Sequence, residues 1–87
     1  MAHTLQIEYD DALLLDVAMP REEFEREAVF LLAAKLYERG RLPSGPAARL
    51  CGMERVAFLL ALPRVGVSMT NLKAEDLDIE LDFAHGP

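Results

Sequence analysis

The stretch that decides the fold spans residues 44–62, SGPAARLCGMERVAFLLAL. Gly52 divides it into two short runs rich in alanine and leucine, and Pro63 follows the second run. Ala48 stands four residues before Gly52, where two helices that meet at a turn need a small side chain. Phe58 stands six residues after it, a spacing that directs the ring back into a shared core. The stretch therefore predicts a helix-turn-helix unit, with Ser44 as the cap of its first helix.

The second helix of this unit, residues 53–62, has few of the side chains that read DNA bases. Five of its side chains are expected to point outward: Glu54, Arg55, Val56, Leu59 and Leu60. Only Arg55 among them is a good donor to bases or phosphates, and Glu54 would repel phosphate. Specific reading of DNA by this helix is therefore predicted to be weak.

A long helix is predicted for residues 21–39. Pro20 and the acidic residues after it are typical of a helix start, and Gly40 is typical of a left-handed helix end. Apolar residues recur every three or four positions and also occupy positions beyond one face. Two buried faces are therefore expected.

The N-terminal segment predicts a short β-strand over residues 4–9, where Leu5, Ile7 and Tyr9 alternate with polar residues. A lone strand needs a partner, which could be its copy in another subunit or a bound protein. Residues 11–17 form a short apolar run that predicts one helical turn.

Length and composition predict a single domain over residues 1–87 of mainly α class. The chain is 52 % hydrophobic, which is more apolar material than one small core needs, so a homodimer that buries the surplus is expected. With Cys51 as the one cysteine, no intrachain disulfide can form. No export signal or membrane span is recognisable, and a cytoplasmic protein is expected.

The charges are segregated along the chain. Residues 1–34 carry eight acids and two arginines, a balance of −6, and residues 65–87 carry five acids and one lysine, a balance of −4. Residues 35–64 carry six basic and two acidic side chains, a balance of +4. This basic island is either a footprint for DNA or an ordinary solvated surface.

The C-terminal segment fits two patterns. Leu77, Ile79, Leu81 and Phe83 alternate with acids as in a strand, whereas Ala74, Leu77, Leu81 and Ala84 form a helical stripe. We favour an acidic helix over residues 74–84, with a strand paired to residues 4–9 as the alternative. In either form the four apolar residues Leu77, Ile79, Leu81 and Phe83 suit docking onto a basic protein partner, and a solvated acidic tail is the plain alternative.

Catalysis, a metal site and a cofactor are not predicted. His3 and His85 lie near opposite ends, and Cys51 has no histidine nearby in sequence to act as its base. The acidic residues at positions 22–27 suit a helix start better than a metal.

Several motifs in order resemble a known family: EEFEREAVFLLAAKLYERGRL, then SGPAARLCGM, then VAFLLALPRVGV, with residues 71–83 as a fainter continuation. These motifs are similar to those of a small prokaryotic family of predicted helix-turn-helix antitoxins, often encoded beside a PIN-domain toxin. The resemblance implies a type II antitoxin that neutralises a PIN-domain ribonuclease by direct binding and represses its operon as a dimer. It places Ser44, Arg49 and Arg55 where contacts to operator DNA are expected.

Two alternatives stay open. The chain could be a stand-alone helix-turn-helix transcriptional regulator, or a dimeric helical adaptor that does not bind DNA. The weak outward face of the second helix favours the adaptor over the regulator.

Overall fold

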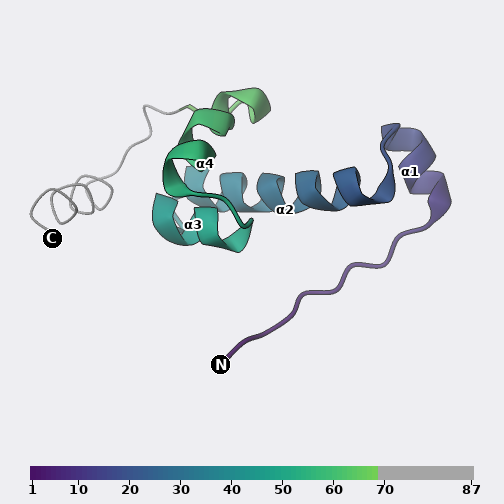
Figure 1. Cartoon of the computed structure of the whole chain (residues 1–87), viewed down its shortest axis with the longest axis horizontal. Coiled ribbons are helices and arrows are strands. Elements are labelled where there is room, and N and C mark those ends of the chain that lie inside the picture. Colours follow the sequence, from purple (N-terminus) through teal and green to yellow (C-terminus); the bar gives the residue numbers. More distant parts are fainter. Residues whose placement is uncertain (69–87) are drawn as a thin grey trace, which may run out of the picture.

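The computed structural model describes residues 1–68, and this part of the chain is mainly helical, as predicted. It contains four α-helices and one 3-10 helix: α1 (Asp11–Val17), α2 (Arg21–Glu38), α3 (Ser44–Leu50), α4 (Arg55–Ala61) and η1 (Leu62–Val65). Figure 1 shows α2 as the long element, with α1 at one end and α3 and α4 at the other. The predicted C-terminal helix over residues 74–84 lies outside the described residues.

Helix α1 is longer than the single turn predicted, because both of its ends are capped. The side chain of Asp10 accepts a hydrogen bond from the backbone N–H of Leu13 at 3.1 Å, which satisfies a free donor of the first turn. At the other end, Ala18 adopts a left-handed conformation with φ of 57°. Its own N–H bonds to Leu15 O, and the next N–H, of Met19, bonds to Leu14 O. This pair of bonds closes the helix.

Helix α2 begins and ends within one residue of the predicted limits. Pro20 precedes its first residue, and Glu22 and Glu23 lie in the first turn beside the positive end of the helix dipole. Gly40 follows the end with φ of 76°. The N–H of Gly40 bonds to Tyr37 O and that of Arg41 to Leu36 O, the same closure as in α1.

Helices α3 and α4 are joined by a turn at Gly52, which has φ of 70°. Its N–H bonds to Arg49 O, and the N–H of Met53 bonds to Ala48 O. The second helix is shorter than predicted: it starts at Arg55 rather than at position 53. After Ala61 the chain tightens into η1, since the proline at position 63 fits the first turn of a new helix and lacks a donor for the old one.

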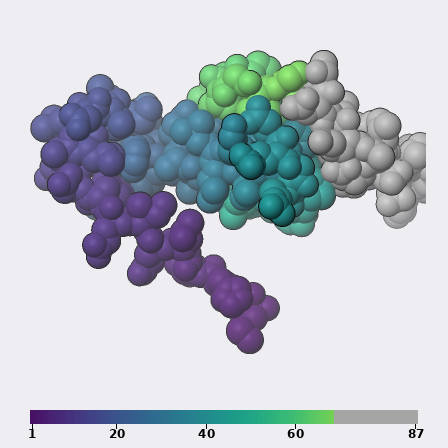
Figure 2. All heavy atoms as spheres, turned by 180° about the vertical axis from the view of Figure 1, so that it is seen from behind, coloured from purple at the N-terminus to yellow at the C-terminus, as the bar shows by residue number. Residues whose placement is uncertain are grey.

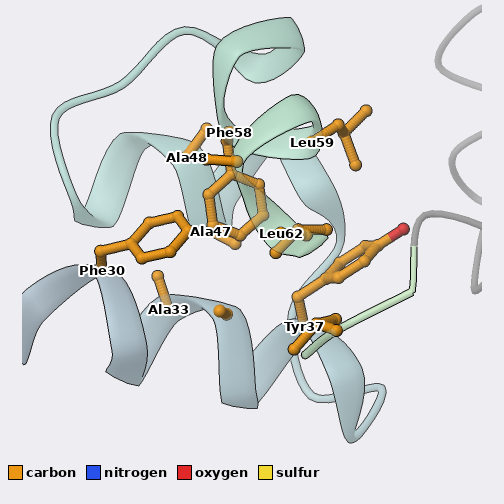
Figure 3. Packing of buried hydrophobic residues seen from close by; sticks show 11 residues of the cluster. Phe30, Ala33, Tyr37, Ala47, Ala48, Phe58, Leu59 and Leu62 are labelled. Atoms are coloured by element: carbon orange, nitrogen blue, oxygen red, sulfur yellow. The ribbon is translucent and has the colours of Figure 1, made fainter. Parts of the chain in front are cut away.

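The core lies where the C-terminal half of α2 meets α3, α4 and η1. Phe58 is fully buried and forms edge-to-face contacts with Phe30 at 5.8 Å and with Tyr37 at 5.9 Å between ring centroids. Ala47 and Ala48 of α3 are small enough to let this helix approach the rings. Figure 3 shows the Phe58 ring between the other two aromatic side chains. The predicted core positions Ala48 and Phe58 are therefore confirmed.

The predicted strand over residues 4–9 is wrong for this chain on its own. Residues 1–68 contain no strand, and residues 1–10 have no regular secondary structure. A strand exists only through the hydrogen bonds of a neighbour, and the described part of the chain offers none. Figure 2 shows this N-terminal segment projecting from the body of the molecule. It is attached at Tyr9, whose ring packs edge-on against Phe24 at 5.0 Å and whose hydroxyl donates to Glu25.

Two further expectations about burial are corrected. Leu59, expected to point outward, is buried in the core next to Phe58, because this seven-residue helix packs against both α3 and η1 and buries neighbouring positions. The expectation of two buried faces on α2 holds for one face only. Its buried residues are Phe30, Ala33, Ala34 and Tyr37. Leu31 and Leu32 are 45 % and 40 % exposed.

Candidate nucleic-acid interface

The side chains of Ser44 and Arg55 are joined by a hydrogen bond across the two short helices. Arg55 Nε donates to Ser44 Oγ at 2.8 Å. Ser44 does not cap α3 as predicted: Pro43 holds the cap position, and Ser44 is the first helical residue. Its side chain is fully buried and therefore accepts this bond inside the fold rather than facing solvent. The bond ties the first residue of α3 to the first residue of α4.

Arg49 lies on the exposed side of α3 and its side chain runs back toward the start of that helix. A methyl group added at Gly45 would lie 3.8 Å from Arg49 Nη1, an ordinary van der Waals distance. Gly45 is the neighbour of Ser44, which holds Arg55. The structure therefore brings the side chains of all three predicted DNA-contact residues together at the beginning of α3.

Ser44 and Arg49 differ in what they could contribute to such an interface. A buried hydroxyl that already accepts a bond from a guanidinium can orient that arginine, and it is not placed to contact a phosphate itself. Arg49 is exposed, so its charge can act directly on an anionic backbone. Ser44 is accordingly a positioning residue in this geometry.

Two members of the basic island are engaged elsewhere. Arg64 extends over the Phe30 ring, 5.8 Å from its centroid, and its Nη2 lies 3.6 Å from Glu27 Oε1 on α2. Lys35 forms an ion pair with Glu38 at 2.8 Å one turn along α2. The local positive charge beside α3 is therefore smaller than the count over residues 35–64 indicates.

The outer surface of α4 is mostly apolar. Val56 and Leu60 are 61 % and 63 % exposed, and Glu54 stands in an extended conformation just before the helix. A surface that enters a DNA groove carries polar donors and positive charge, which these residues lack. The exposed face of α4 resembles a protein-contact surface more than a base-reading one.

Cys51 acts as a small half-buried side chain near the end of α3. Its thiol lies 3.5 Å from both Ala47 O and Ala48 O, and burial raises its pKa above the ordinary value of 9.0. The thiol is therefore protonated at neutral pH, which makes it a poor nucleophile. Within residues 1–68, no group of three or more histidine, cysteine, aspartate or glutamate side chains could hold a metal ion.

The contact between Tyr9 and α2 was not predicted from the sequence. The Glu25 carboxylate accepts the bond from the Tyr9 hydroxyl, and this bond is the main cause that raises the pKa of Tyr9 above 10.0. Partners 16 positions apart cannot be matched by a helical or strand period. The predicted partner-binding residues Leu77, Ile79, Leu81 and Phe83 lie outside the described part of the chain.

The described residues form a small helical protein with one core, and the side chains of Arg49 from α3 and Arg55 from α4 meet beside the first turn of α3. Within residues 1–68, none of its helices combines the length and apolarity that crossing a membrane requires. Residues 1–86 match the model of a family described as "Uncharacterised protein family (UPF0175)", and the chain belongs to this family. No curated protein and no solved structure shows significant similarity to it.

Proposed function

We propose that this protein is the antitoxin of a type II toxin-antitoxin pair. It neutralises a PIN-domain ribonuclease by direct binding, acts as a homodimer in the cytoplasm, and represses its own operon. The observation that supports the DNA-binding part is the joint placement of Ser44, Arg49 and Arg55 at the start of α3, in two helices that meet at a turn. The ordered sequence motifs and their resemblance to predicted antitoxins support the toxin-binding part.

The contact to the toxin is expected from the acidic C-terminal segment. Purification of the full chain together with the product of the adjacent gene tests it, with ribonuclease activity as the second readout. We expect a stable complex in which the ribonuclease is inactive. Leu81→Glu should weaken binding by about tenfold or more, because a buried apolar anchor is lost, whereas Leu60→Glu on α4 should not. Absence of a complex with either neighbouring gene product would eliminate the toxin-binding part.

DNA binding has a separate test in the chain's own promoter. Arg49→Ala and Arg55→Ala should each weaken binding and reduce the slope of log affinity against log salt by about 1 per lost phosphate contact. Arg26→Ala, in the acidic half of α2, is the matched control. Ser44→Ala should lower affinity with an unchanged salt slope, because it removes the bond that orients Arg55 and leaves the charge count intact. Promoter binding that is unchanged by all three substitutions would exclude this surface as the DNA-binding site.

A homodimeric adaptor is the second candidate, and the apolar surface of α4 is the observation that favours it. Val56 and Leu60 are both largely exposed on α4, and an exposed apolar surface is typical of a site that binds another protein. If the adaptor is correct, Leu60→Glu dissolves the oligomer and promoter DNA is not bound. Leu59 cannot serve for this test, because its burial means that a glutamate there would disrupt the core.

A further inference from the structure

Helix α2 carries two apolar faces on nearly opposite sides, and residues 1–68 cover only one of them. The buried face holds Phe30, Ala33, Ala34 and Tyr37, spaced three or four residues apart. A second set of four apolar residues has a similar spacing. Three of its members precede a buried residue by two positions, and the fourth precedes Tyr37 by one position. We call this second set the uncovered face: Ala28, Leu31, Leu32 and Leu36. A step of two residues turns a helix by about 200°, so the uncovered face points away from α3 and α4.

The exposure of these side chains is unusual for the centre of a long helix. Leu31 and Leu32 are about as exposed as surface residues, and Ala28 and Leu36 are half-buried. A solvated helix face is normally polar. One charged side chain, Lys35, lies within this stripe, and its ammonium turns toward Glu38 while its stem is aliphatic. An apolar stripe of this kind is covered by a partner in the working protein.

We propose that a second copy of this chain packs on the uncovered face, with the two α2 helices antiparallel about a twofold axis near Leu32. The inference rests on the homodimer of the proposed function and assigns the surface that forms it. A twofold interface requires the same patch from both copies, and an antiparallel crossing brings Ala28 of one copy opposite Leu36 of the other.

The charges of α2 favour this arrangement over a parallel one. Residues 21–29 carry four acids and two arginines, a balance of −2, and residues 30–41 carry three basic side chains and Glu38, a balance of +2. An antiparallel pair sets the acidic half of each helix beside the basic half of its partner, with Glu25 near Arg39. A parallel pair would set like charges together, which costs free energy.

The N-terminal segment adds to the same surface. The uncovered face alone is about 12 Å long, whereas a stable dimer buries about 800 Å² on each partner. Tyr9 packs on Phe24, one turn before Ala28, so the segment departs from the end of this face. Leu5 and Ile7 on the segment are 71 % and 70 % exposed. They enlarge the apolar area that a second copy can cover.

The first test measures the mass of the full chain in solution by sedimentation equilibrium, with neither toxin nor DNA present. The wild-type chain should be a dimer. Leu32→Glu should give a monomer with unchanged helix content by circular dichroism, because Leu32 is exposed in the single chain. The control is Leu60→Glu on α4, where the leucine is 63 % exposed against 40 % for Leu32, and this variant should remain a dimer.

The second test fixes the orientation by disulfide cross-linking in a Cys51→Ser background. Leu32→Cys should cross-link to its own copy, because it lies near the twofold axis. Ala28→Cys and Leu36→Cys should cross-link only when the two variants are mixed. Self-linking of Ala28→Cys would show a parallel pair and overturn the proposal.

Two other outcomes also overturn it: a wild-type chain that is monomeric at every concentration, and a Leu32→Glu variant that stays dimeric. If the wild-type monomer is also destabilised by Leu32→Glu, the occupant of the face is a segment of the same chain rather than a second copy. Failure of toxin or promoter binding leaves these readouts unaffected, so the interface and the proposed function can fail separately.

Discussion

The described chain divides at position 30 into two regions that use apolar residues differently. Residues 1–29 contain leucine, isoleucine and valine in quantity, and none of these residues is buried. Residues 30–67 contain all eleven buried hydrophobic residues. Since both regions are apolar, composition does not decide burial here; the return of the chain after Gly40 does, because it places α3 and α4 against one half of α2. The first region has the apolar side chains for a core, and residues 1–68 offer too little surface to pack against them.

The largest expected effect is in the second region, at Phe58. Phe58→Ala should lower the free energy of unfolding by about 3–5 kcal/mol, because the ring is fully buried between two other aromatic rings. A small domain has about 5–15 kcal/mol in total, so a large fraction of its stability would be lost. Urea unfolding followed by circular dichroism measures this. Leu60 lies on the same helix and its side chain is exposed, so Leu60→Ala should change stability by no more than about 0.5 kcal/mol. Equal effects at the two positions would contradict the placement of the core.

Substitution of two glycines in the second region should change the free energy of unfolding by smaller amounts, which differ between the two positions. Gly52→Ala should destabilise by about 1–2 kcal/mol, since its φ of 70° is unfavourable for a residue with a Cβ. Gly45→Ala removes a helix-disfavouring glycine from α3 but adds a Cβ directly before the ring of Pro46, so it should change stability by less than about 1 kcal/mol. Thermal unfolding of the two variants in parallel compares the effects. A stabilising Gly52→Ala would mean that the turn between α3 and α4 has a different backbone.

The smallest effect is in the first region and is expected as a shift in titration rather than in stability. Glu25→Gln should lower the pKa of Tyr9 toward 10.0, because the carboxylate both accepts a hydrogen bond from the neutral phenol and repels the phenolate. A raised pKa in the folded state means that the bond is complete below pH 10.0 and is lost as the pH rises through the raised pKa. The titration of Tyr9 is measured by phenolate absorbance as a function of pH. The absorbance of the Tyr9→Phe variant is subtracted to remove the contribution of Tyr37. An unchanged Tyr9 titration in Glu25→Gln would show that the N-terminal segment is not held at this contact.

The elements that depend on local signals were predicted correctly from the sequence. The long helix and its end at Gly40, the turn at Gly52 and the inward position of Phe58 all follow from residues within a few positions of one another. Capping, glycine conformation and helical spacing act over this range. The family resemblance was also confirmed by the match over residues 1–86.

Contacts between residues far apart in the sequence were not predicted. The bond between Arg55 and Ser44 and the contact between Tyr9 and Glu25 join residues 11 and 16 positions apart, with no repeating pattern to reveal them. Leu59 was misplaced because Val56, Leu59 and Leu60 are all apolar, so the pattern of a seven-residue helix does not identify its inner face. The strand over residues 4–9 was predicted from side-chain alternation, which reports a tendency to pair and carries no information on whether a partner is present.

The closing turns that follow α1, α2, α3 and η1 have a kinetic consequence. Each is made by two hydrogen bonds that reach back no more than five residues, at Ala18, Gly40, Gly52 and Gly66. The packed elements α2, α3, α4 and η1 also follow one another directly along the chain. Helical domains with such local connections fold in about microseconds to milliseconds. The core can therefore form while the chain is still leaving the ribosome, before any second copy or partner has been met.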